Sequence, residues 1–192
     1  MKILLSLFAV LLLSACVEVA PDTRPPDMTF ENYSPVVLNV AKIEVIDRYH
    51  PPLREPNIEH NFPLSPAAAA KKLAEKILVA AGTRDILHVY IEDASVVREE
   101  ILQENKIWDI FDHKPAERLK AKVLLRFELV SFDAPDIVIG HAEVIAKRNK
   151  ELLRGISMAD RDRAYFSLTG DLMDDVSDGM KNVVRSTFGK GV

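Results

Sequence analysis

Residues 118–131 alternate between apolar and polar side chains except at Leu124 and Val130, and this pattern limits the fold more than any other in the chain. An alternation with a period of two places successive side chains on opposite faces of a β-strand. The polar positions include Lys122 and Arg126, so we expect one face of this strand to meet water. The apolar positions, which we expect to face the core, are Leu119, Ala121, Val123, Leu125, Phe127 and Leu129.

A hairpin partner for this strand follows directly in the sequence. Residues 133–136 read Asp-Ala-Pro-Asp, which is typical of a turn, and residues 137–148 form the next predicted strand. Because both strands carry a polar outer face, they predict an antiparallel sheet with one face in water. The inward positions expected in the second strand are Val138, Ala142, Val144 and Ala146.

Two further strands are predicted earlier in the chain. Residues 86–97 form one of them, with alternating apolar side chains at its start. Residues 36–46 form the other and are rich in β-branched side chains, but their apolar positions change face partway along. A bulge near Ala41 and Lys42 would explain the change, and so would burial of both faces at the centre of the sheet, which we prefer.

Two helices complete the predicted elements. Ser65 followed by proline is a typical helix start, apolar residues then recur at helical spacing to residue 81, and Gly82 is expected to end the helix. Ser157 is expected to cap a longer helix that runs to about residue 187. Gly179 inside it suggests a close approach to the sheet. The expected apolar stripe of this helix is Tyr165, Leu168, Leu172, Val176, Met180 and Val183.

The order of these elements is β-α-β-β-β-α, which is not a strict alternation of strands and helices. It predicts an α+β fold in which a mostly antiparallel sheet of about four strands carries two helices on one face. The chain has 192 residues, of which 48% are hydrophobic, so it is long enough and apolar enough for one folded domain. We expect that domain over residues 35–189.

The first sixteen residues read MKILLSLFAVLLLSAC. Their apolar run is shorter than the ~20 residues that span a bilayer, and it matches a secretory signal peptide over residues 1–15. The final Leu-Ser-Ala-Cys resembles the lipobox of bacterial lipoproteins, which implies cleavage before Cys16 and attachment of lipid to it. The alternative is an ordinary secretory signal with a chance cysteine. Residues 16–34 contain three prolines and are predicted to be a lipidated tether.

Composition and motifs argue against several classes of function. After removal of residues 1–15 the chain has 24 basic and 29 acidic residues, a net charge of −5, which disfavours nucleic acid as a partner. His50, Glu59 and His60 could form a metal set, but their spacing matches no motif, and we expect no metal there. The sequence holds no motif for a cofactor or a catalytic centre, so we expect no cofactor and no enzymatic activity.

Residues 98–117 join two predicted strands and are too long for a tight turn. One interpretation is an apolar tip that binds a partner, because aromatic residues are typical anchors of interfaces. The alternative is a segment that folds back over the core. The partner-binding candidates are Ile107, Trp108, Ile110 and Phe111.

The stretch HPPLREPNIEHNFPLSP with its helix, the phrase IEDASVV and the late strand–strand–helix resemble an uncharacterised family of proteobacterial lipoproteins. The element order is more loosely similar to the LPS-assembly lipoprotein and to auxiliary lipoproteins of ABC-type transporters. Val17 after the cysteine resembles the sorting pattern for export to the outer membrane. We therefore expect a lipoprotein anchored there on the periplasmic face, acting as an accessory or assembly factor for an envelope protein complex. The alternative is a module that binds lipid or a small molecule.

Overall fold

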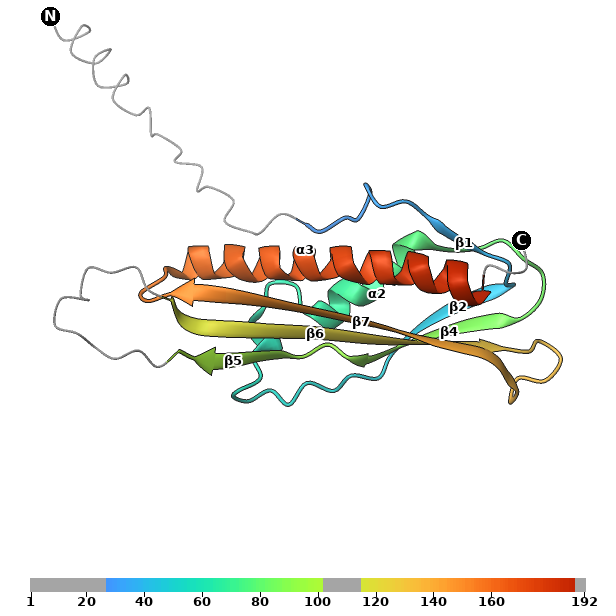
Figure 1. Ribbon diagram of the computed structural model, residues 1–192, viewed down its shortest axis with the longest axis horizontal. Helices are drawn as coiled ribbons and strands as arrows, with labels where there is room; N and C mark the ends of the chain where they lie inside the picture. The colour runs from blue at the N-terminus through green and yellow to red at the C-terminus, as the bar shows by residue number, and fades with distance from the viewer. Residues whose placement is uncertain (1–26, 102–114, 189–192) are drawn as a thin grey trace, which may run out of the picture.

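The computed structural model describes residues 27–101 and 115–188. Within these ranges the chain has the predicted α+β class: a five-stranded sheet carries two α-helices, which lie on the same side of it (Figure 1). The helices are α2, Pro66–Ile77, and α3, Met158–Val183. No helix of the described residues is long and apolar enough to cross a membrane. The signal peptide, Cys16 and the partner-binding candidates Ile107, Trp108, Ile110 and Phe111 lie outside the described residues.

The sheet is built around β6. This strand pairs antiparallel with β7 on one edge, and antiparallel with β4 and then β5 on the other. Beyond β4 lies β2, which runs parallel to it. The sheet is therefore mixed, because the connection from β2 to β4 passes through α2 and is long enough for a parallel crossover. The strands are β2, Lys42–Asp47; β4, Ile86–Asp93; β5, Val96–Glu100; β6, Pro115–Val130; and β7, Val138–Leu153.

The prediction of one central strand over residues 36–46 is wrong. The segment divides into β1, Val36–Leu38, and β2, which belong to different sheets. β1 forms a small parallel pair with β3, Leu78–Ala80, whereas β2 lies at the edge of the main sheet. The change of face in the apolar pattern reflects this break and not burial on both faces.

The end predicted for the first helix also differs. α2 ends at Ile77, and the next three residues form β3. Gly82 therefore does not end the helix. A Cβ on Gly82 would lie 2.5 Å from the carbonyl carbon of Asn39 and 2.6 Å from the amide nitrogen of Val40. The glycine is needed because two backbone segments cross there.

The core lies between the sheet and the helices. Phe127 of β6 is fully buried, and the inward alternation predicted for this strand is confirmed. In β7 the predicted burial of Val144 and Ala146 is confirmed, but Val138 is 49% exposed. The β6–β7 register shifts between Leu129 and Val130, which separates Val138 from the inward positions that follow.

The long helix α3 begins as predicted. The Ser157 hydroxyl accepts a hydrogen bond from the Asp160 amide at 3.1 Å, which satisfies one of the free amides of the first turn. The predicted stripe faces the sheet, with Leu172 and Val176 completely buried. A π-helical turn, η4, Val184–Phe188, follows the helix.

The glycines of α3 provide the first testable prediction. A Cβ at Gly179 would lie 2.4 Å from Cγ1 of Val144, whereas at Gly170 the nearest atom would be Cε of Met28 at 3.8 Å. We expect Gly179→Ala to lower the free energy of unfolding by about 1–3 kcal/mol through overpacking. Gly170→Ala should raise it by up to ~1 kcal/mol, because alanine is the better helix former.

Urea denaturation of the two variants tests this difference in sign. Adding Val144→Ala to the Gly179→Ala variant removes the clash, so the two changes should cost less together than the sum of each alone. A Gly179→Ala variant as stable as Gly170→Ala would contradict the close approach.

Residues 27–33, predicted to belong to the tether, pack against the helices. Asp27 forms an ion pair with Lys72 of α2 at 2.8 Å, and the Tyr33 hydroxyl donates a 2.5 Å hydrogen bond to Asp174 of α3. Met28 and Phe30 are buried between these contacts. The folded part thus begins before residue 35, and the chain enters it on the helix side (Figure 1).

Candidate functional site

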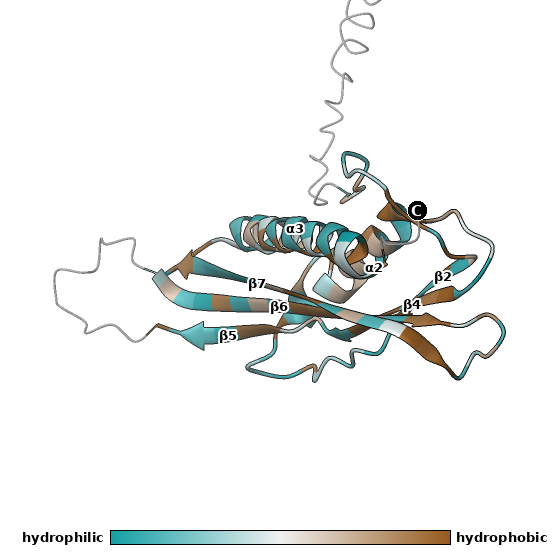
Figure 2. Cartoon of the chain, turned by 45° about the vertical axis from the view of Figure 1, so that its right-hand side comes forward, coloured by the Kyte–Doolittle hydropathy of each residue, from teal (hydrophilic) through white to brown (hydrophobic). Residues whose placement is uncertain are grey.

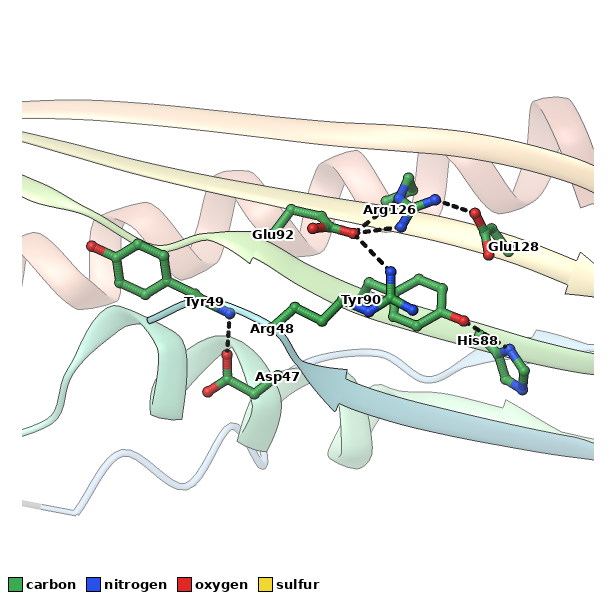
Figure 3. A network of polar contacts seen from close by, with 8 residues as sticks. All are labelled: Asp47, Arg48, Tyr49, His88, Tyr90, Glu92, Arg126 and Glu128. Carbon is green, nitrogen blue, oxygen red and sulfur yellow. Dashed lines mark hydrogen bonds and ion pairs between the residues drawn. The ribbon is translucent and has the colours of Figure 1, made fainter. Parts of the chain in front are cut away.

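The sheet surface opposite the helices, which we call the open face, carries the most extensive polar network of the described residues. Its side chains come from alternate positions of neighbouring strands. In the β4–β6 register Tyr90 lies opposite Arg126, and His88 lies opposite Glu128. Arg48, directly after β2, completes the group (Figure 3).

Tyr90 is the centre of the network. It is only 6% exposed although it belongs to the open face, because two guanidinium groups cover its ring. Cζ of Arg48 lies 3.6 Å from the ring centroid, and Cζ of Arg126 lies 4.9 Å from it. Both distances are within the range of cation–π attraction.

One carboxylate holds the two arginines in place. Glu92 accepts hydrogen bonds from Nη2 and Nε of Arg126 at 2.6 and 3.0 Å, and it lies 3.5 Å from Nη1 of Arg48. Arg126 also pairs with Glu128. The hydrogen bond from Arg126 to Glu92 is the main cause that raises the pKa of Arg126 above its ordinary value.

A second chain of contacts extends from the Tyr90 hydroxyl toward the edge of the sheet. This hydroxyl lies 3.0 Å from Nδ1 of His88, and Nε2 of His88 lies 3.2 Å from Glu44. Glu44 pairs with Lys42 at 2.6 Å, and the hydrogen bond from Lys42 lowers the pKa of the Glu44 carboxyl. The network therefore balances its positive and negative charges internally.

These contacts fix the shape and charge pattern of the open face. Each arginine is held by a carboxylate and stacked on an aromatic ring, so its side chain is ordered before any partner arrives. Tyrosine and arginine are also enriched among the residues that dominate binding energy at protein interfaces. The arrangement is suited to the recognition of another surface.

A groove lies at the end of β2, where Asp47 and Tyr49 line it, between the proline-rich loop and the start of α2. Its volume is about 570 Å³, within the range of ligand sites. Glu59 in its wall is only 2% exposed. The Tyr49 hydroxyl donates a 2.7 Å hydrogen bond to Glu59, and the Val96 amide donates another at 3.1 Å. Burial, followed by the bond to Glu59, raises the pKa of Tyr49.

Two of the three residues considered as a metal set, Glu59 and His60, line this groove. Glu59 is bonded to Tyr49 and Val96, and His60 lines the groove. In residues 27–101 and 115–188, no group of three or more His, Cys, Asp or Glu side chains is arranged to hold a metal ion.

Sequence reasoning missed the cluster around Tyr90. The alternation in residues 86–97 places His88, Tyr90 and Glu92 on one face, but it carries no signal for the return of Arg48 over the tyrosine ring. The only available sign was that polar side chains fill the outer positions of both neighbouring strands.

Comparisons with known proteins give no family for the chain. No protein-family model matches it, and no curated protein matches it significantly. The fold is similar to the solved structure of the rare lipoprotein B from Shewanella oneidensis, with 5% identity, a TM-score of 0.39, and coverage of 76% of this chain and 95% of that one. It is also similar to a minor lipoprotein from Acinetobacter baumannii, with 10% identity, a TM-score of 0.41, and coverage of 77% and 92%.

A further similarity is to the PelC dodecamer from Paraburkholderia phytofirmans, with 12% identity, a TM-score of 0.23, and coverage of 76% of this chain and 92% of that one. The first two structures are of lipoproteins. At these TM-scores, all below 0.5, the similarities carry no argument about function.

Proposed function

We propose that the protein is a lipoprotein anchored in the outer membrane on its periplasmic side, and that it is a non-enzymatic accessory or assembly factor of a cell-envelope complex. In this proposal the lipid on Cys16 holds the chain at the membrane, and the open face binds the protein partner. The observation that carries the proposal is the ordered cluster of Arg48, Tyr90 and Arg126 on a sheet face that neither helix covers.

The entry point of the chain supports this division of roles. Asp27 and Tyr33 are bonded to the two helices, so the N-terminal segment enters on the side of the sheet opposite the open face. Cys16 precedes Asp27 by eleven residues, which span at most about 40 Å when fully extended. A tether attached on that side allows the open face to point away from the anchoring membrane.

Purification of the lipidated full-length protein from membranes tests the proposal. Arg48→Ala uncovers the Tyr90 ring and should reduce the recovery of a stoichiometric protein partner at least tenfold, because truncation of a central interface residue typically costs 2 kcal/mol or more. Arg84→Ala is the matched control. Arg84 is an exposed arginine that forms an ion pair with Asp133 at 2.5 Å, and neither residue belongs to the Arg48–Tyr90 cluster. Equal recovery of the partner with both variants would exclude the Arg48–Tyr90 cluster as the binding surface.

The groove beside Glu59 favours a second candidate function, the binding of a lipid or small molecule in the periplasm. Its volume is large enough, and Phe62, Leu64 and Ala67 give it apolar walls. The same purification distinguishes the two functions. A small molecule released in stoichiometric amount on denaturation, with no protein partner recovered, would favour the groove over the open face.

A further inference from the structure

The last strand of the sheet has a long edge without a strand partner. β7 has sixteen residues and pairs with β6, and no other strand of the described chain pairs with it. Long edge strands are usually protected by prolines, bulges, charged side chains or covering segments, because their free amide and carbonyl groups can pair with another chain. β7 contains no proline, its start is apolar (Figure 2), and its bulge lies near that start, between Val138 and Gly140, so the stretch around Ile145 is regular and carries only charges as protection.

Two charged side chains at open-face positions of β7 differ from the other charges of this face that are described above, because they have no ion-pair partner in the described chain. Glu143 and Lys147 are exposed, and neither forms an ion pair with any described residue. Their neighbours across the strand already have partners: Arg126, opposite Glu143, pairs with Glu92, and Lys122, opposite Lys147, pairs with Asp93 at 2.9 Å.

An exposed apolar side chain lies between these two charges. Ile145 lies on the same face and is 57% exposed. Glu143 and Lys147 are four residues apart along an extended strand, which is too far for their side chains to form an ion pair with each other. Within the described chain, therefore, Glu143 and Lys147 have no ion-pair partner, and Ile145 between them is not covered by other side chains. It would be complemented by a neighbouring antiparallel strand with a basic, a β-branched and an acidic residue at the opposite positions.

A second copy of the chain could offer the same three residues, but α3 argues against it. α3 lies over β7, with Gly179 against Val144 and Asp175 paired with Arg148 at 2.5 Å. Paired β7 strands would lie about 4.8 Å apart, whereas packed helices need about 8–10 Å between axes. Two copies would also bring the acidic flanks of α3 together, which carry Asp171, Asp175 and Asp178.

We infer that the edge of β7 around Ile145 binds an extended antiparallel strand of a protein partner, with a basic residue opposite Glu143 and an acidic residue opposite Lys147. Main-chain hydrogen bonds hold the strand, and the two charge pairs set its register. The inference deepens the proposed function by naming the form of the partner. It concerns a different surface from the Arg48–Tyr90 cluster.

A peptide of defined sequence tests the inference on the full-length lipidated protein in detergent. The matched probe is a blocked peptide, Thr-Glu-Thr-Ile-Thr-Lys-Thr-Thr-Thr-Val-Thr, which places Glu opposite Lys147, Ile opposite Ile145 and Lys opposite Glu143. The control peptide exchanges its Glu and Lys and has the same composition. Fluorescence anisotropy should give about tenfold tighter binding of the matched peptide, because cross-strand pairs change from opposite to like charges in the control. The difference should shrink in 1 M salt.

The double variant Glu143→Lys with Lys147→Glu provides the decisive comparison, since both side chains are exposed. It should reverse the preference and bind the control peptide more tightly. Hydrogen exchange should slow in the amides of β7 when the matched peptide is bound. Equal binding of both peptides, protection of another strand, or a dimer that protects β7 without peptide would each overturn the inference.

The two proposals can fail separately. Selective binding of the peptide at β7 without any partner recovered from membranes would contradict the proposed function and leave the strand site standing. A partner that is recovered and lost with Arg48→Ala, together with a peptide that does not bind, would contradict the strand site alone.

Discussion

Cys16→Ser should abolish lipid attachment and leave the protein either uncleaved at that site or released as a soluble product. Cys16 is the only cysteine of the chain, so no other thiol can accept the lipid. Stable anchoring by acyl chains needs more than one membrane signal, and the net negative charge of the mature chain provides no polybasic alternative. Fractionation of cells and labelling with a fatty-acid probe measure the two effects.

Ser14→Ala is the matched control, because it changes a neighbouring small residue and keeps Cys16. This variant should label and fractionate like the wild type. A Cys16→Ser protein that remains in the membrane fraction and incorporates the probe to the same extent would contradict the lipoprotein assignment.

Phe127→Ala should lower the free energy of unfolding by about 3–5 kcal/mol, a large part of the stability of a typical domain. Phe127 is fully buried toward the end of β6, where its neighbours in the register are Val89 and Ala142. Truncation to alanine leaves a cavity in the core that the surrounding side chains fill only in part. Urea denaturation of the variant measures the loss.

Lys122→Ala on the opposite face of the same strand is the control. The strand pattern alone predicts a cost under about 0.5 kcal/mol. The structure adds an ion pair with Asp93 at 2.9 Å, so we expect up to about 1 kcal/mol. Similar losses for Phe127→Ala and Lys122→Ala would mean that the faces of β6 are assigned the wrong way round.

The sequence by itself determined the elements whose signals are local. The alternation in β6 placed Phe127 in the core, because a strand has only two faces and one of them carries charges. The apolar stripe of α3 and its Ser157 cap were readable for the same reason, since both depend on residues within a few turns. The signal peptide and Cys16 are also local motifs, and their roles are predictions from the sequence.

Only the tertiary structure decided how these elements pair. The division of residues 36–46 into β1 and β2 depends on the distant partners β3 and β4, and a local apolar pattern cannot indicate which strand it will meet. The cover of Arg48 over Tyr90 depends on the path of the chain after β2. The unpaired charges Glu143 and Lys147 become recognisable only when β7 is known to be an edge, because the same alternation would describe a strand with neighbours on both sides.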